Sequence, residues 1–267
     1  VLHQNLSIES ESCIGSTYII AVPTPVVTDS DTTRNVPNMA SVYNALDQIT
    51  PLLKAGDLII LESTSPVGSI AEMVGALKLA RMDLFDNQEI PLVHFAYCPE
   101  RVIPGNTLNE LVDNDRIIGG YTEACSKKAK VFYESFVKGN CIMTDAKTAE
   151  MTKLVENSCR DSQLAFVNEL SMLCDKLDVD VSELIQLANR HPRINLLNPG
   201  PGVGGHCVAV DPWFLIYNNE LETPFMQLAR QVNNQKEEWV LKKVTKILKE
   251  MQSNRLICLG LSFKPDV

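Results

Sequence analysis

The sequence lacks the cysteine and histidine patterns that would assign it to a metal-binding or disulfide-rich class. Its eight cysteines are scattered along 267 residues, and no two of them form a C-x-x-C pair. The four histidines show no metal-ligand spacing alongside them. In a chain of this size such cysteines indicate buried or reactive thiols in a reducing compartment, and not a disulfide framework. We therefore expect a cytoplasmic protein without a metal site.

A long apolar run and an excess of basic charge are also missing. No stretch approaches the roughly 18 apolar residues of a membrane span, and no signal peptide opens the chain. Lysine and arginine number 24 against 33 acidic residues, which gives a net charge of −9. Because nucleic-acid binding normally needs a basic surface, we expect neither a nucleic acid nor a membrane as partner. A phosphate ligand can still bind locally, through a few cationic side chains and backbone amides.

A third absence concerns the first residues. A doubly wound nucleotide-binding domain begins with a strand, a glycine-rich turn and a helix, and nothing before Tyr18 supplies them. The first clear strand covers residues 16–22 and runs into the polar turn Pro23-Thr24-Pro25. Such a turn is typical of the carboxyl edge of a parallel sheet, where ligands bind. The chain is therefore expected to begin partway through such a domain.

The residues that follow alternate between predicted strands and helices. A loop is predicted over 28–38. It is followed by a helical pattern over 39–54, and Gly56 is the residue predicted to terminate this helix. Buried strands are predicted at 58–61, 91–97, 116–120 and 141–143, and helices at 71–79 and 123–137. This alternation favours an α/β fold with a partial Rossmann-like parallel sheet and right-handed crossovers.

The longest helical pattern up to that point covers residues 145–177. Lys153 and Asn157 are four residues apart, so both project from one face of this helix. A polar stripe on a helix is usually a solvated face, and Glu156 could pair with the lysine. Two neighbouring donors are also what an oxyanion clamp needs, so both interpretations stay open.

The second half of the chain is predicted to be helical. A short helix over 181–187 has Asp180 or Ser182 as its cap, and a long helix covers 224–251. A long helix of this kind commonly joins two domains or packs in a dimer. From residue 255 a strand enters a glycine turn. We predict three domains: a partial Rossmann-like domain over 1–144, a helical central domain over 145–252, and the start of a second α/β domain over 253–267.

A glycine-rich stretch at 198–211 carries the chemistry. Four glycines in six residues precede Cys207, and Asp211 follows four residues later. Glycine permits close approach of the backbone to a ligand, which suggests a thiol presented to a small molecule. Residues 200–205 also match G-x-G-x-x-G, but the strand before and the helix after that a dinucleotide site needs are missing. The alternative is a glycine-rich turn with an unimportant cysteine.

A series of motifs identifies a resemblance that covers nearly the whole chain. They are A-V-P-T-P at 21–25, E-S-T-S-P-V-G at 62–68, Y-C-P-E-R-V-I-P-G at 97–105, A-E-M-T-K-L-V-E-N at 149–157, N-E-L at 168–170, N-R-H-P-R at 189–193, the glycine stretch through Pro212, and G-L-S-F-K-P-D at 260–266. In this order they resemble the UDP-glucose/GDP-mannose dehydrogenase family. The H-P-R segment and the G-H-C-V-A-V-D-P-W run favour the branch that oxidises UDP-N-acetyl-D-mannosamine.

The resemblance implies a chemistry for the residues already singled out. The family uses two NAD+ to oxidise the primary alcohol of the sugar to a carboxylate, through an aldehyde. Cys207 is implied to be the nucleophile, which forms a thiohemiacetal and then a thioester that water hydrolyses. Lys153 and Asn157 are implied to stabilise the oxyanions at the reacting carbon. Asp211 is implied to orient Lys153 or to assist hydrolysis.

The same resemblance implies further site residues. Thr64 and Glu100 are implied to hold the hydrolytic water and, with Val22, Pro23 and Thr24, to contact NAD. Arg193 resembles an arginine that reaches across a dimer interface to the substrate. The remaining implied substrate contacts are Arg101, Gly204, Gly205, His206, Phe263 and Lys264. Because dimers in the family form through the central helical domain, a homodimer is expected.

Two other interpretations belong to different classes. A 3-hydroxy acid dehydrogenase also carries a Lys-x-x-x-Asn pair on its central helix, but it needs no cysteine in the glycine stretch. The second interpretation is a dimerisation module that has no catalytic activity. The glycine fingerprint for NAD would lie before residue 1 and most of the sugar-nucleotide domain after Val267. We therefore expect this chain by itself to bind NAD weakly or not at all, with negligible turnover.

Overall fold

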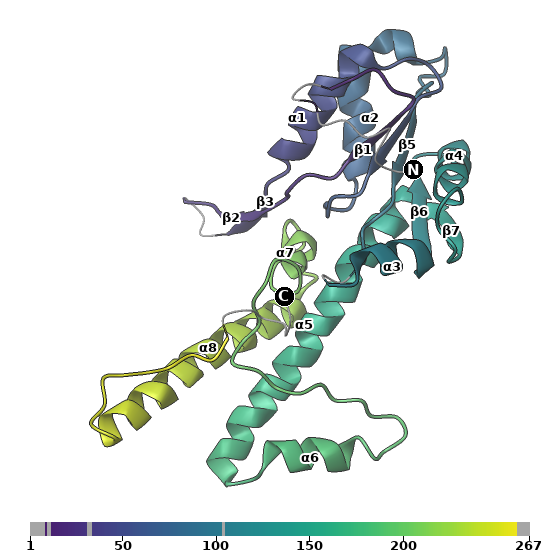
Figure 1. Cartoon of the computed structure of the whole chain (residues 1–267). Coiled ribbons are helices and arrows are strands. Elements are labelled where there is room, and N and C mark those ends of the chain that lie inside the picture. Colours follow the sequence, from purple (N-terminus) through teal and green to yellow (C-terminus); the bar gives the residue numbers. More distant parts are fainter. Residues whose placement is uncertain (1–8, 10–11, 31–33, 103–104, 261–267) are drawn as a thin grey trace. The chain divides into compact units, whose positions relative to one another are not determined.

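The computed structural model describes residues 9, 12–30, 34–102 and 105–260. The chain divides into two compact units, residues 1–153 and residues 154–267 (Figure 1). This division lies nine residues after the predicted domain boundary at 144, inside one long helix. Each unit has its own architecture.

The first unit is built on a five-stranded sheet with the order β1-β4-β5-β6-β7. Its strands are β1 (Thr17–Ile20), β4 (Leu58–Leu61), β5 (His94–Tyr97), β6 (Arg116–Gly120) and β7 (Cys141–Asp145). The pairs β1–β4, β4–β5 and β6–β7 are parallel. The prediction of an α/β fold with a Rossmann-like parallel sheet is therefore confirmed.

One pair of strands departs from the parallel arrangement. Strands β5 and β6 run antiparallel, with Ala96 opposite Gly120. A parallel pair needs a crossover that covers a face of the sheet. In its described residues, the connection between β5 and β6 contains α3 (Thr107–Asp113), a seven-residue helix without a buried residue, which the sequence analysis did not predict. Since α3 buries no residue, this helix does not cover a face of the sheet as a parallel crossover would.

Helices cover both faces of the sheet, as the side chains of β4 demonstrate. All four side chains of β4 are buried. Ile59 and Leu61 lie in one apolar cluster with residues of α1 (Ala40–Ile49) and α2 (Ser69–Ala80). Leu58 and Ile60 lie in another, with residues of α4 (Glu123–Tyr133). Alternate residues of a strand point to opposite faces, so a continuous apolar run is what a sheet covered on both sides needs.

Two local predictions in this unit were wrong. Helix α1 ends at Ile49 and a short 3-10 turn, η2 (Thr50–Leu52), follows it, whereas the prediction ended the helix at Gly56. Pro51 has no N–H to continue the helix, which explains the early end. The predicted loop over 28–38 includes part of an antiparallel ribbon of β2 (Val26–Thr28) and β3 (Asn35–Pro37). The β-branched valines at 26, 27 and 36 favour that pairing. A second short turn, η3 (Met82–Leu84), follows α2.

The second unit contains helices and, among its described residues, no strand. Helix α5 (Ala146–Leu177) begins in the first unit and continues into the second. Helices α6 (Val181–Ala188) and α8 (Pro224–Glu250) follow as predicted, and the carboxylate of Asp180 caps α6. Helix α7 (Asp211–Ile216) was not predicted. None of the helices in the described part of the chain combines the length and the apolar composition that crossing a bilayer requires.

The strand predicted from residue 255 is not formed in residues 255–260, the described part of that segment. A strand is stabilised by hydrogen bonds to a neighbouring strand, and no strand pairs with these residues in the part of the chain that is described. The apolar side chains of the segment are largely exposed, with Leu259 94% exposed.

Candidate active site

The predicted site residues fall into two groups, one in each unit. In the second unit, Cys207 lies in an irregular loop directly before α7, and its side chain is exposed. The carbonyl of Cys207 accepts the backbone N–H of Val210 at 3.0 Å and that of Asp211 at 2.8 Å. These bonds fold the loop into a turn at the start of α7. Gly205 has a φ of +87°, which a side-chain-bearing residue rarely adopts. The thiol is therefore held on a short and well-defined turn.

Asp211 and Asn157 are brought together by a hydrogen bond between side chains. The amide Nδ2 of Asn157, on α5, donates to Oδ2 of Asp211 at 2.6 Å. Asp211 is the first residue of α7 and is only 2% exposed. Because the carbonyl of Cys207 also binds the N–H of Asp211, one aspartate links the thiol-bearing turn to α5. Lys153 and Asn157 lie four residues apart on one continuous helix, as predicted.

A buried polar network binds the backbone of the glycine stretch at Gly200. The amide oxygen of Asn168, on α5, accepts the backbone N–H of Gly200 at 3.0 Å. Its Nδ2 donates to Oδ1 of Asn233, on α8, at 2.9 Å. Asn233 and Arg230 both donate to Oδ1 of Asp161, at 2.8 and 2.6 Å. Burial raises the pKa of the Asp161 carboxyl, while the Arg230 guanidinium and the Asn233 amide act in the opposite direction.

Sequence reasoning missed the residues of α8 in this network. Asn233 is fully buried and Arg230 is 5% exposed, so both occupy the inward face of the helix. The available signal was their spacing, because polar residues three apart that share a face with Ala229 and Val232 interrupt an apolar ladder. The hydrogen bonds of this buried network favour one arrangement of the helices that carry them. The glycine stretch is thus anchored to α5 and α8.

The loop that carries Arg193 is closed by a neighbouring amide. Asn189 accepts the N–H of Leu196 at 2.7 Å and donates to its carbonyl at 3.0 Å. Arg193 lies within this closed loop and is exposed, as is His206 beside the thiol. No described contact joins Arg193 to Cys207. Phe263 and Lys264 lie outside the described residues.

The group in the first unit gathers at the carboxyl ends of three parallel strands. Val22, Thr64 and Glu100 follow β1, β4 and β5, so they belong to one edge of the sheet. The hydroxyl of Ser63 accepts the N–H of Val22 and donates to its carbonyl, both at 2.8 Å. The loops that carry Val22–Thr24 and Thr64 are therefore tied together.

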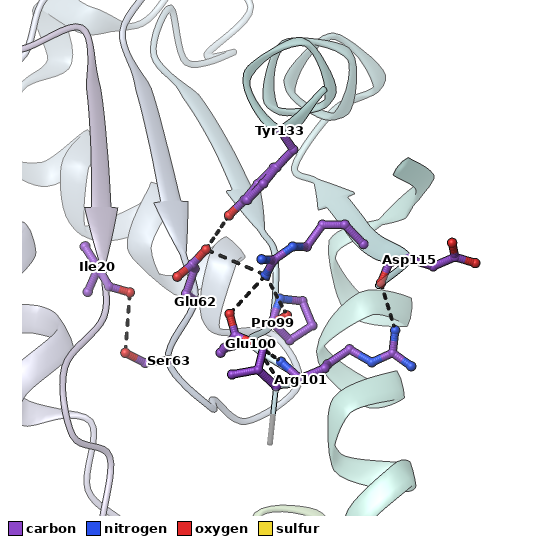
Figure 2. Close-up of polar contacts among 10 residues, drawn as sticks. Ile20, Glu62, Ser63, Pro99, Glu100, Arg101, Asp115 and Tyr133 are labelled. Carbon is purple, nitrogen blue, oxygen red and sulfur yellow. Dashed lines mark hydrogen bonds and ion pairs between the residues drawn. The ribbon is translucent and has the colours of Figure 1, made fainter. Parts of the chain in front are cut away.

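The Glu100 carboxylate is held from two sides. Its Oε1 accepts the backbone N–H of Arg101 at 2.5 Å and that of Val102 at 2.7 Å. Its Oε2 faces the guanidinium of Arg116, from β6, at 3.4 Å (Figure 2). The Arg101 guanidinium donates to the carbonyl of Asp115 at 3.3 Å. The carboxylate is thus oriented by its own loop and by a buried cation.

Arg116 lies at the centre of this cluster. It is 5% exposed, and its Nη1 also donates to the Pro99 carbonyl at 3.4 Å and lies 3.8 Å from Oε1 of Glu62. The Tyr133 hydroxyl donates to the same Glu62 oxygen at 2.6 Å (Figure 2). The Arg116 guanidinium lies 4.8 Å from the Tyr133 ring centroid. Sequence reasoning missed Arg116, Glu62 and Tyr133. The available signal was a charged residue at the head of an apolar strand.

Two cysteines differ sharply in their surroundings. Cys98 directly follows β5 and is fully buried, and that burial raises the pKa of its thiol. Burial likewise raises the pKa of the neighbouring Tyr133 hydroxyl, and the charge of Glu62 adds to that rise. A thiol needs to ionise to act as a nucleophile, so Cys98 is unsuited to that role. Cys207 is exposed, which makes it the accessible thiol of the two. None of the eight cysteines, all of them described, is in a disulfide.

Comparison with known proteins identifies the family. Residues 2–137 match the NAD binding domain of the UDP-glucose/GDP-mannose dehydrogenase family, and residues 147–235 match its central domain. The chain belongs to this family. In the part of the chain that the structure describes, no three histidine, cysteine or acidic residues are grouped so that they could hold a metal ion.

Two similar proteins and one similar solved structure are named as dehydrogenases. A UDP-N-acetyl-D-mannosamine dehydrogenase of Campylobacter jejuni is 53% identical over 94% of this chain and 61% of its own length. An NDP-N-acetyl-D-galactosaminuronic acid dehydrogenase of Ralstonia solanacearum is 49% identical over 94% of this chain and 59% of its own length. The structure of the UDP-N-acetyl-mannosamine dehydrogenase Cap5O from S. aureus aligns with a TM-score of 0.85 at 40% identity, over 98% of this chain and 61% of that chain. The chain thus spans about 60% of the relatives it matches.

Proposed function

We propose that this chain belongs to an NAD-dependent dehydrogenase that oxidises a UDP-N-acetylhexosamine at its 6-hydroxymethyl group to the uronic acid. UDP-N-acetyl-D-mannosamine is the first candidate substrate. The observation that carries this proposal is the 53% identity to a UDP-N-acetyl-D-mannosamine dehydrogenase over 94% of the chain. A relative named for an N-acetyl-D-galactosaminuronic acid derivative is 49% identical. Because the two identities are similar, the experiment compares the epimers directly.

The proposed cofactor is NAD, which supplies a hydride acceptor for each of two oxidations. The support from this chain is the edge of the sheet where Val22, Pro23, Thr24 and Thr64 lie, because ligands of open α/β sheets bind outside the carboxyl ends of the strands. The two loops are tied by Ser63, which would hold the wall of such a site in place. Glu100 lies at the same edge, and its remaining exposed side can face a ligand.

Cys207 is proposed as the nucleophile. Its thiolate attacks the aldehyde carbon, so a sulfur–carbon bond forms and the carbonyl oxygen becomes an oxyanion. After the second oxidation the sugar carbon is held as a thioester. Water then breaks the sulfur–carbon bond, which releases the carboxylate and regenerates the thiol. The exposed position of Cys207 on the turn before α7 is what supports this role.

Three residues are proposed to assist at the reacting carbon. Lys153 and Asn157 lie one turn apart on α5, as donors to an oxyanion need to. One amide hydrogen of Asn157 is taken by Asp211, so the aspartate fixes the amide and leaves its second hydrogen for the substrate.

Thr64 and Glu100 are proposed to hold the hydrolytic water. Arg193, Arg101 and the residues around the thiol, Gly204, Gly205 and His206, are proposed substrate contacts.

The proposed assembly is a homodimer through the central helical domain. The described helices of the second unit expose large apolar side chains, among them Phe166 at 57% and Leu173 at 49% on α5, Leu187 at 63% on α6 and Leu241 at 67% on α8. Exposed apolar residues at this density often mark an interface. Eight cysteines without a disulfide suit a reducing compartment, which supports a cytoplasmic location.

The decisive experiment measures NADH formation with UDP-N-acetyl-D-mannosamine and its epimers. It is run on the full-length gene product and, in parallel, on these 267 residues alone. Formation of a UDP-uronic acid with two reduced cofactors per sugar would support the proposal. A full-length protein that oxidises no UDP-N-acetylhexosamine would refute it, and oxidation of 3-hydroxy acids instead would favour the related dehydrogenase class.

A further inference from the structure

The N-terminus of α2 needs a cap that its own sequence does not supply. This helix follows the segment 62–68, which carries Thr64, and its N-cap residue is Gly68. Gly68 has a φ of +105° and no side chain, so it makes no side-chain cap. The first N–H groups of a helix have no partner within the helix and must find one elsewhere.

Glu150 supplies that cap from a distant helix. Its side chain, on α5, is fully buried. Oε2 accepts the N–H of Gly68 at 2.6 Å, and Oε1 accepts the N–H of Ile70 at 2.8 Å. Both oxygens of one buried carboxylate are therefore used at the end of α2 that favours negative charge. The partners lie 82 and 80 residues away along the chain, so the contact is tertiary.

The part of α5 that carries Glu150 is itself fixed within the first unit. Asp145 caps the helix, with its Oδ1 accepting the N–H of Thr148 at 3.0 Å. Ala149 is fully buried beside β6, and a Cβ added to Gly119 would lie 2.4 Å from the Ala149 Cβ. Gly119 thus allows the first turns of α5 to pack directly against the backbone of β6. Glu150 thus joins α2 to an element that is already held.

We propose that Glu150 is a positioning residue that fixes the Thr64-bearing segment against the helical turn that leads to Lys153. Lys153 lies three residues after Glu150, close to one turn of the helix. The inference rests on the proposed roles of Thr64 and Lys153 in sugar oxidation. It also excludes the N-terminus of α2 as a binding site for a cofactor phosphate, because a carboxylate of the chain already occupies it.

The first test measures amide hydrogen exchange at Gly68 and Ile70 by NMR in the 267-residue chain. In Glu150→Ala both amides should exchange roughly tenfold faster than in the wild type, because each loses a charge-assisted hydrogen bond. In Glu150→Gln only one oxygen remains as an acceptor, so the effect should be smaller. Glu169→Gln, an exposed change on the same helix, is the matched control and should leave both amides unchanged.

The second test asks whether the contact serves catalysis. In the full-length enzyme, Glu150→Gln should lower kcat about tenfold while KM for the UDP-sugar stays within about twofold, since the substrate contacts remain. When Glu150→Gln is combined with Thr64→Ala, the loss in kcat should be less than additive. Both changes act on the same contact between the Thr64-bearing segment and α5.

The outcomes separate the inference from the proposed function. Unchanged exchange at Gly68 and Ile70 in Glu150→Ala would overturn the inference, as would fast exchange with full kcat in Glu150→Gln. If Glu150→Ala does not fold, Glu150→Gln decides in both assays. An inactive wild-type enzyme would refute the proposed function, whereas the exchange measurement would still show whether Glu150 holds the segment.

Discussion

The proposed chemistry depends on which thiol can react. Cys207→Ser should abolish formation of the uronic acid, by at least ~1,000-fold, because a serine hydroxyl does not replace the thiolate as a covalent nucleophile. Acid formation by the full-length enzyme is measured by chromatography of the UDP-sugars. Cys159→Ser, at another exposed cysteine, is the control and should keep full activity. Equal acid formation by the two variants would contradict the assignment of Cys207.

The hydrogen bond between Asn157 and Asp211 can be measured by a double-mutant cycle. Because its length is 2.6 Å and its acceptor is buried, the coupling free energy of Asn157→Ala and Asp211→Ala should be about 1–3 kcal/mol. Urea unfolding of the four proteins gives this value. Asn157→Ala combined with Glu183→Ala, an exposed change on α6, should be additive. A coupling near zero in the first cycle would show that the two side chains do not interact in solution.

At the scale of elements, Arg116 joins β6 to the loops that follow β4 and β5. Arg116→Met removes a buried cation and leaves Glu62 and Glu100 without it, which should cost about 3–5 kcal/mol of unfolding free energy. Urea unfolding provides the measurement. Lys127→Met removes an exposed i, i+4 pair with Glu123 and should cost less than ~0.5 kcal/mol. If the two variants lost the same stability, the cluster would not contribute as the contacts suggest.

The burial of Glu150 beside the start of α2 should make the free energy of unfolding depend on pH. Burial raises the pKa of Glu150, with a smaller rise from Glu72, and this outweighs the two backbone N–H groups and Lys147, which lower it. The folded state then holds the proton more tightly than the unfolded state, so stability falls as pH rises from about 4.3 through the folded-state pKa. Glu150→Gln has no such proton. Its deficit against the wild type should therefore shrink as pH rises in this window, whereas Glu169→Gln should follow the wild type.

The sequence predicted those elements whose own residues determine them. Strand β4 is an unbroken apolar run, and the predicted range 58–61 is the observed one. The helical period of 145–177 gave α5 within one residue at its start. Residues whose role depends on partners far along the chain could not be found this way. Glu150 acts 82 residues from Gly68, and Arg116 contacts carboxylates in the loops that follow two other strands. The antiparallel β6 also escaped prediction, because pairing direction depends on how a connection folds.

The candidate site shows the same division. The order of motifs located Cys207, Lys153 and Asp211 as candidates, whereas the bond that links Asn157 to Asp211 required coordinates. The polar network beneath the glycine stretch joins Asp161 and Asn168 to α8 over some seventy residues. A local pattern can mark polar residues on an inward face, but it does not specify their partners, because the partners become neighbours only when the helices pack.

At the scale of the whole molecule, the exposed apolar residues of the second unit predict self-association. Phe166 and Leu173 lie seven residues apart on α5 and so share one face. If that face is buried between two copies, Phe166→Glu combined with Leu173→Glu should weaken the dimer at least tenfold, because each change places a charge in an apolar contact. Light scattering across a dilution series measures the mass. Leu79→Glu, at an apolar residue 92% exposed in the first unit, should leave a dimer intact. A wild-type chain that stays monomeric at all concentrations would rule out this interface, and a dimer insensitive to the α5 changes would place it on other residues.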